Sequence, residues 1–168
     1  MDKAHFLTLY KSLIRPHLDY GNTIYYPITK KNKRILENVQ RRATKLVPGL
    51  RDLPYETRLQ ELNLPTLEYR RQRFDQILLY KMLHRKVDFD YNKLFELSTG
   101  THGTRGNPYK LQKPRASKSI RQHSYSHRAV NNWNNLPNEV VCATSVNSFK
   151  SRLDKLWKAK RYNLSDIY

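Results

Sequence analysis

Residues 35–47, Ile-Leu-Glu-Asn-Val-Gln-Arg-Arg-Ala-Thr-Lys-Leu-Val, form the stretch that decides the fold. At about 100° per residue, the apolar positions fall on one side of a helix and the cations on the other. Pro48 and Gly49 then end the helix, because proline has no amide hydrogen and glycine accepts the left-handed conformation common at helix ends. We expect the core to hold the apolar side, which comprises Ile35, Leu36, Val39, Ala43, Leu46 and Val47.

Basic residues dominate the composition, with 32 Lys and Arg against 14 Asp and Glu, a formal net charge of +18. Between residues 30 and 45, seven basic residues stand against Glu37 alone, and residues 97–138 contain no Asp or Glu. Two such clusters indicate an RNA or DNA partner; the alternative is a basic surface that is merely solvated. The residues expected to bind nucleic acid are Lys30, Arg34, Arg41, Arg42, Lys45, Arg73, Arg105, Lys110, Lys113 and Arg115.

The remaining periodicity predicts a mostly α fold in two parts. Residues 1–97 are expected to form a helical hairpin and bundle. Residues 98–168 are expected to form an irregular basic loop, a short β element over 109–113 and a smaller helical subdomain. Helix starts are predicted after Asp2, Thr29, Pro54, Pro65, Ser124 and Ser145, because these residue types are favoured at or just before the first turn.

Several side chains have two interpretations. Tyr20, Tyr25 and Tyr26 either pack at the turn of the hairpin, which we expect, or stack on bases. Arg70 and Arg71 share a helix side with apolar residues, so they need a carboxylate partner such as Glu56, Glu61 or Glu68, or else a phosphate. Arg73 is predicted to point outward.

No catalytic, cofactor or metal site is predicted. His123 and His127 are four residues apart and could share a metal, but a hydrogen-bonded histidine pair is the expected interpretation. Phosphate-binding loops, nucleophile elbows and zinc-protease motifs are absent from the sequence. Cys142 is the single cysteine, so we expect a reducing, intracellular location, the nucleus in particular. No apolar run approaches the roughly 20 residues of a membrane span, and no membrane partner is expected.

Four ordered blocks carry a family resemblance. They are LYKSLIRPHLDYG at 9–21, VQRRATKL at 39–46, LPTLEYRR at 64–71 and WNNLP at 133–137, followed by SVNSFK at 145–150. Together they resemble the region after the palm in non-LTR (LINE-like, Jockey/CR1-type) retrotransposon reverse transcriptases. The sequence departs from that pattern mildly at Asp19, where the family more often has glutamate, and at Tyr26, where it usually has tryptophan.

The resemblance implies that residues 1–97 are thumb-like helices and that the chain grips template and primer. It also implies a partner, the palm and fingers of a reverse transcriptase. The paired aspartates of a polymerase palm do not occur in the sequence, so we expect no polymerisation by this chain alone. Two other functions stay open: a free-standing basic helical protein-interaction module and, more weakly, a metal-dependent nuclease.

Overall fold

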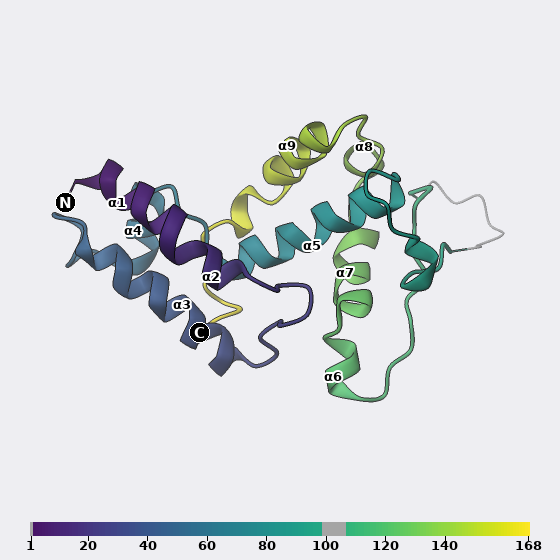
Figure 1. Cartoon of the computed structure of the whole chain (residues 1–168), viewed down its shortest axis with the longest axis horizontal. Helices are drawn as coiled ribbons and strands as arrows, with labels where there is room; N and C mark the ends of the chain where they lie inside the picture. Colours follow the sequence, from purple (N-terminus) through teal and green to yellow (C-terminus); the bar gives the residue numbers. More distant parts are fainter. Residues whose placement is uncertain (1, 99–106) are drawn as a thin grey trace. The chain divides into compact units, whose positions relative to one another are not determined.

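The computed structural model describes residues 2–98 and 107–168, and it confirms the mostly helical fold (Figure 1). The α-helices are α1 (Lys3–Leu9), α2 (Arg15–Asp19), α3 (Lys30–Ala43), α4 (Tyr55–Glu61), α5 (Leu67–Leu83), α6 (Ser119–Gln122), α7 (Tyr125–Asn134), α8 (Asn138–Val141) and α9 (Val146–Leu156). A π-helical turn, η1 (Tyr10–Ile14), joins α1 to α2, and three 3-10 turns are η2 (Thr44–Leu46), η3 (Tyr91–Lys93) and η4 (Lys158–Lys160). In place of the strand expected at 109–113, Leu97 and Leu111 form an isolated antiparallel bridge. Over the described ranges, no helix is long and apolar enough to cross a membrane.

The chain divides into two compact units, Met1–Arg71 with Lys158–Tyr168, and Gln72–Trp157. The boundary therefore falls inside α5 and not at the expected position between residues 97 and 98. In the first unit, the Thr66 amide donates to the Arg161 carbonyl at 3.1 Å, which ties the C-terminal segment to residues before the boundary. In the second unit, Gln76 of α5 donates to the Ala129 carbonyl at 3.2 Å, which ties the end of α5 to α7.

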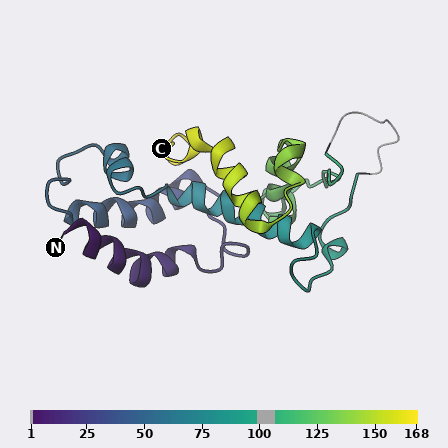
Figure 2. The ribbon, with the colours of Figure 1, turned by 90° about the horizontal axis from the view of Figure 1, so that it is seen from above.

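The first unit contains the predicted helical hairpin. The segment from α1 to α2 runs antiparallel to α3, side by side with it (Figures 1 and 2). Both predicted caps are confirmed: Asp2 accepts from the His5 amide at 2.9 Å, and Thr29 Oγ1 accepts from the Asn32 amide at 3.2 Å. The core of the unit comprises Phe6, Tyr10, Ala43, Val47, Tyr55, Leu59, Leu62 and Leu64.

The first helix buries a narrower face than predicted. The three- and four-residue spacing of the sequence predicts that one side of this helix, with Phe6, Leu7, Tyr10, Leu13 and Ile14, is buried. Phe6 and Tyr10 are buried, but Leu13 and Ile14 are exposed. The reason is the π-helical turn η1, whose wider i to i+5 repeat changes the angular position of the residues that follow it. Pro16 then lies in the first turn of α2, which follows η1 without a break in the helical backbone.

Helix α3 is rotated away from the predicted orientation. Ala43 and Val47 are buried as expected, but Ile35, Val39 and Leu46 are 55%, 41% and 66% exposed. The buried side instead carries polar residues, Glu37, Gln40 and Thr44. The helix turns this side inward because each of these groups finds a hydrogen-bond partner in the unit. The prediction that Ile35, Val39 and Leu46 face the core was therefore wrong.

At the hairpin turn and at the start of α5, the structure differs from two expectations. Tyr20 and Tyr25 are 82% and 74% exposed, whereas Tyr26 is partly buried and donates to Glu68 at 2.5 Å. Only Tyr26 therefore packs as predicted. Arg70 forms a structural ion pair, but its partner is Asp19, at 2.6 Å, and not one of the expected glutamates.

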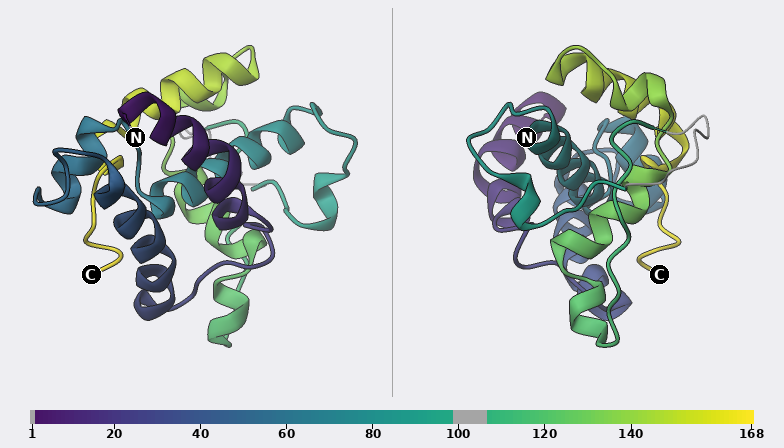
Figure 3. Two further views of the ribbon diagram at one scale, coloured as in Figure 1. Left: turned by 60° about the vertical axis from the view of Figure 1, so that its left-hand side comes forward. Right: turned by 90° about the vertical axis from the view of Figure 1, so that its right-hand side faces the viewer.

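The second unit is built on the C-terminal part of α5. Tyr80 donates to the Ala143 carbonyl at 2.5 Å, and its ring stacks on Phe149 of α9 with centroids 4.3 Å apart. In α7, Ala129, Val130 and Trp133 are buried, as the sequence predicts. The short helix α6 lies at the N-terminal end of α7 (Figure 3). The predicted Ser145 cap of α9 is confirmed, because its hydroxyl accepts from the Ser148 amide at 3.1 Å.

Truncation of Trp133 should destabilise the chain strongly. Its ring is fully buried near Phe149, and its indole N–H donates to the Tyr109 carbonyl at 2.8 Å. Trp133→Ala should lower the free energy of unfolding by about 3 to 5 kcal/mol, measured by urea denaturation. Ile120→Ala is the control, since Ile120 is 78% exposed and its truncation should cost less than about 0.5 kcal/mol. An equal decrease of the unfolding free energy in Trp133→Ala and Ile120→Ala would contradict the placement of Trp133 in the core.

The burial of Glu37 predicts a pH dependence of stability. Burial raises the pKa of Glu37 above its ordinary value of 4.5, so its stabilising contribution is complete below pH 4.5 and is lost as the pH rises through the raised pKa. Glu37→Gln removes this titration. The difference in unfolding free energy, wild type minus variant, should therefore decrease between about pH 4 and about pH 7. Urea denaturation across this range tests the sign, and a difference that stays constant or increases would refute it.

Candidate nucleic-acid interface

The exposed side of α3 presents cations that have no partner among the described residues. Arg34, Arg42 and Lys45 of the predicted set are exposed and make no side-chain hydrogen bond or ion pair there. Their exposure follows from the burial of the Glu37 and Gln40 side, which leaves positions 34, 42 and 45 directed to solvent. Arg34 and Arg42 belong to α3, and Lys45 belongs to the adjoining turn η2. These three residues, named the α3 cations below, can each meet a phosphate without breaking a contact with another described residue.

Two more predicted residues of this cluster are engaged by the C-terminal segment. Lys30 Nζ donates to the carbonyl oxygens of Ser165 and Tyr168, at 3.1 and 2.9 Å. Arg41 donates to the Tyr168 hydroxyl at 3.3 Å, and its guanidinium lies over the Tyr168 ring at 5.6 Å. Lys30 and Arg41 are thus less available to a ligand than the α3 cations.

Arg73 does not have the free, outward position that was predicted. Its guanidinium pairs with the Asp154 carboxylate through two bonds, at 2.5 and 2.8 Å. The pair joins α5 to α9 inside the second unit, and both side chains are about one-third exposed or less. A bidentate pair of this kind stabilises packing, so we remove Arg73 from the candidate interface.

Several carboxylates of the chain form ion pairs with cations that have a structural role. Asp75 is buried and holds Arg128 at 2.8 Å, Asp19 holds Arg70, and Glu68 holds Lys33 at 2.8 Å. Because the few acids pair with these cations, they do not neutralise the α3 cations. The charge of Arg34, Arg42 and Lys45 is therefore not balanced by an ion pair among the described residues.

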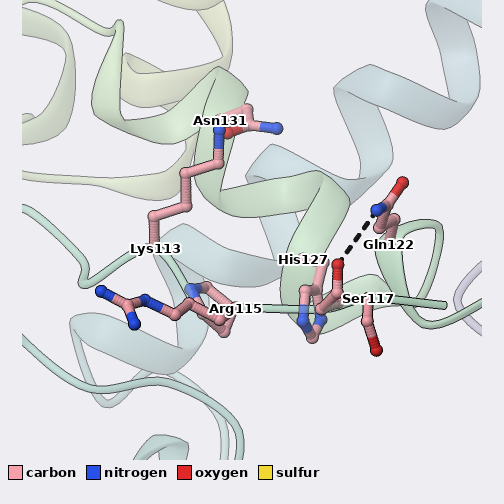
Figure 4. A pocket seen from close by; sticks show the side chains of 8 residues that line it. Lys113, Arg115, Ser117, Gln122, His127 and Asn131 are labelled. Carbon is pink, nitrogen blue, oxygen red and sulfur yellow. Dashed lines mark hydrogen bonds between the residues drawn. The ribbon is translucent and has the colours of Figure 1, made fainter. Parts of the chain in front are cut away.

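A pocket in the second unit brings together two other predicted residues. Its volume is about 900 Å³, and Lys113 and Arg115 form part of its wall (Figure 4). Both side chains are exposed and have no partner among the residues that the structure describes. The other lining residues are Pro114, Ala116, Ser117, Gln122, His127 and Asn131, so hydroxyl, amide and imidazole groups accompany the cations.

Local hydrogen bonds fix the shape of this pocket. Gln122 at the end of α6 donates from Nε2 to the Ala116 carbonyl at 3.0 Å, which holds the basic segment against the helix (Figure 4). Ser124 occupies the predicted N-cap position of α7, but its hydroxyl donates to the Arg121 carbonyl at 2.8 Å and does not cap the helix. This turn between α6 and α7 directs His127 and Asn131, one helical turn apart, toward the pocket.

The last two predicted residues stand apart from the pocket. Lys110 is exposed, and its carbonyl accepts from the Ser98 amide at 2.8 Å beside the isolated bridge. Arg105 lies outside the described residues. The pocket therefore unites only Lys113 and Arg115 of the predicted set.

Sequence reasoning missed the neutral residues of the pocket, Ser117, Gln122, His127 and Asn131. The spacing of His123 and His127 was noticed, but the two do not line the pocket together; only His127 does. Among residues 2–98 and 107–168, no group of three or more His, Cys, Asp or Glu side chains is placed to hold a metal. The spacing of His127 and Asn131 on α7 could have suggested a shared face.

Comparison with known proteins adds no family. No family model matches the chain, and no curated protein or solved structure matches it significantly. The function has to be argued from the geometry of the α3 cations and of the pocket.

Proposed function

We propose that the chain binds RNA and DNA through the sugar-phosphate backbone, as the part of a retroelement reverse transcriptase that grips template and primer. Lys and Arg side chains neutralise phosphates and release condensed counterions, and this gives affinity with little sequence preference. The sequence blocks from 9–21 to 145–150 favour the reverse-transcriptase assignment. The palm and fingers would come from elsewhere.

One observation carries the proposal: cations from both predicted basic clusters are exposed and have no ion-pair or hydrogen-bond partner among residues 2–98 and 107–168. They are Arg34 and Arg42 on α3, Lys45 on the adjoining turn η2, and Lys113 and Arg115 at the pocket. A structural role would have paired them with carboxylates, as it pairs Arg70, Arg73 and Arg128. Because these five charges gather in two clusters, they favour an anionic ligand.

The α3 cations can be tested by their effect on salt dependence. Replacing Arg34, Arg42 and Lys45 together with Gln should leave the fold intact, because none of the three side chains has a described partner. The slope of log affinity against log salt for a single strand should decrease by about 0.7 per lost contact, or by about 2 in total. Fluorescence anisotropy between about 50 and 200 mM salt measures this slope.

The matched control replaces Arg85, Lys86 and Lys93 with Gln, which removes the same charge from exposed residues outside both clusters. Its slope should stay close to that of the wild type. If the slope of log affinity against log salt decreases equally in the two variants, binding depends only on net charge. The α3 cations are then an ordinary solvated surface. Primer extension by the purified chain would contradict the assignment to a part without a palm.

The pocket cations should contribute independently. Lys113→Gln with Arg115→Gln removes two exposed charges from one wall of the pocket, and affinity for a single strand should decrease with a slope change of about 1.4. Circular dichroism should be unchanged, since neither side chain has a described partner. If the salt dependence of affinity in this variant equals that of the wild type, the pocket is not part of the interface.

A protein-interaction module is the second candidate, and one observation favours it. Ile35, Val39 and Leu46 are exposed on α3, next to the cations. Exposed apolar side chains gathered on one helix often mark a protein contact. Ile35→Ser with Val39→Ser should weaken such a contact and leave nucleic-acid affinity, measured by anisotropy, unchanged. A loss of nucleic-acid affinity in this variant would show that the apolar residues belong to the nucleic-acid surface and not to a separate protein contact.

A further inference from the structure

His127 lines the pocket and uses only one of its two ring nitrogens. Its Nδ1 lies 3.0 Å from the Ser124 hydroxyl and 3.3 Å from the Ser126 hydroxyl. Its Nε2 is buried and has no hydrogen-bond partner among the described residues. Buried polar atoms without a partner are uncommon in folded proteins, and one that borders a pocket is a candidate ligand contact.

The protons of the two serines decide the tautomer of the ring. The Ser124 hydroxyl lies 2.8 Å from the Arg121 carbonyl, a group that can only accept. When the single hydroxyl proton of Ser124 is directed to that carbonyl, the oxygen of Ser124 accepts from Nδ1–H of His127 across the 3.0 Å contact. Ser126 can direct its own proton to the second lone pair of the Ser124 oxygen, 3.2 Å away. In the neutral ring, Nε2 is therefore an unprotonated acceptor.

An acceptor beside two cations selects for a particular ligand chemistry. Phosphate oxygens satisfy Lys113 and Arg115, but a phosphodiester has no hydrogen to offer to His127 Nε2. The backbone of DNA contains no hydrogen-bond donor at all. The backbone of RNA contains one donor per nucleotide, the ribose 2′-hydroxyl, whatever the base.

We propose that His127 Nε2 accepts a hydrogen bond from a ribose 2′-hydroxyl of an RNA strand whose phosphates lie at Lys113 and Arg115. His127 is then the residue by which the pocket distinguishes RNA from DNA. The volume of about 900 Å³ is sufficient for a nucleotide. Nε2 is buried in this structure, so the contact requires the pocket wall to shift, and residues 113–117 of this wall are in neither a helix nor a strand. This inference rests on the proposed function and assigns a specificity to it.

The test compares three oligonucleotides of one sequence: single-stranded RNA, DNA and 2′-O-methyl RNA, which keeps the oxygen and removes the donor. Binding to the full chain is measured by fluorescence anisotropy at about pH 8, where an ordinary imidazole is neutral. One hydrogen bond should make RNA bind roughly three- to tenfold more tightly than the other two. His127→Phe should remove this preference, so that RNA, DNA and 2′-O-methyl RNA bind to the variant with similar affinity.

Two further variants separate the proposal from a folding defect. His123→Phe is the matched control, because His123 does not line the pocket, and it should keep the preference. Ser124→Ala removes the oxygen that fixes the tautomer, so it should lower the RNA preference without changing either pocket cation.

The outcomes distinguish this inference from the proposed function. Equal affinity of the wild type for RNA and 2′-O-methyl RNA overturns the inference while backbone binding stands. A preference that persists in folded His127→Phe also overturns it. Absence of binding to all three oligonucleotides refutes the proposed function, and the inference fails with it.

Discussion

The buried carboxylate of Glu37 is the constraint on which the first unit depends. Its Oε1 accepts from the Tyr55 hydroxyl at 2.6 Å and from the Gln40 amide at 3.2 Å, and its Oε2 accepts from the Leu67 amide at 2.9 Å. Gln40 in turn accepts from the Tyr10 hydroxyl at 2.6 Å. One network thus joins η1, α3, α4 and the start of α5. Since a buried polar group is costly without hydrogen-bond partners, this network favours one rotation of α3.

That rotation has a direct consequence for function. With Glu37, Gln40 and Thr44 directed inward, positions 34, 42 and 45 face solvent together with the apolar Ile35 and Val39. The same helix therefore offers charge for a polyanion and apolar surface for a protein. One rotation of α3 therefore places the polar residues in the core of the first unit and the proposed binding residues on its surface.

Charge is distributed in the same manner in the second unit. Asp75 and Asp154 each hold an arginine of the unit in a bidentate pair, and these arginines stabilise packing between helices. Lys113 and Arg115 lie in a segment that contains no acid, so they remain available. The arrangement explains how a chain with 32 basic residues can use some as structural ties and keep others for a ligand.

The sequence by itself determined the helices, because periodicity, caps and breakers act within a few residues of each other. The caps at Asp2, Thr29 and Ser145, the left-handed Gly49 and the buried face of α7 were all predictable. The sequence also located both basic clusters, because a cluster is found by counting basic and acidic residues along the chain. Only the tertiary structure decided which side of α3 is buried, that Arg73 pairs with Asp154, and that His127 and Asn131 line one pocket with Lys113. These outcomes depend on residues 14 to 81 positions apart in the sequence, and a local pattern carries no information on such pairs.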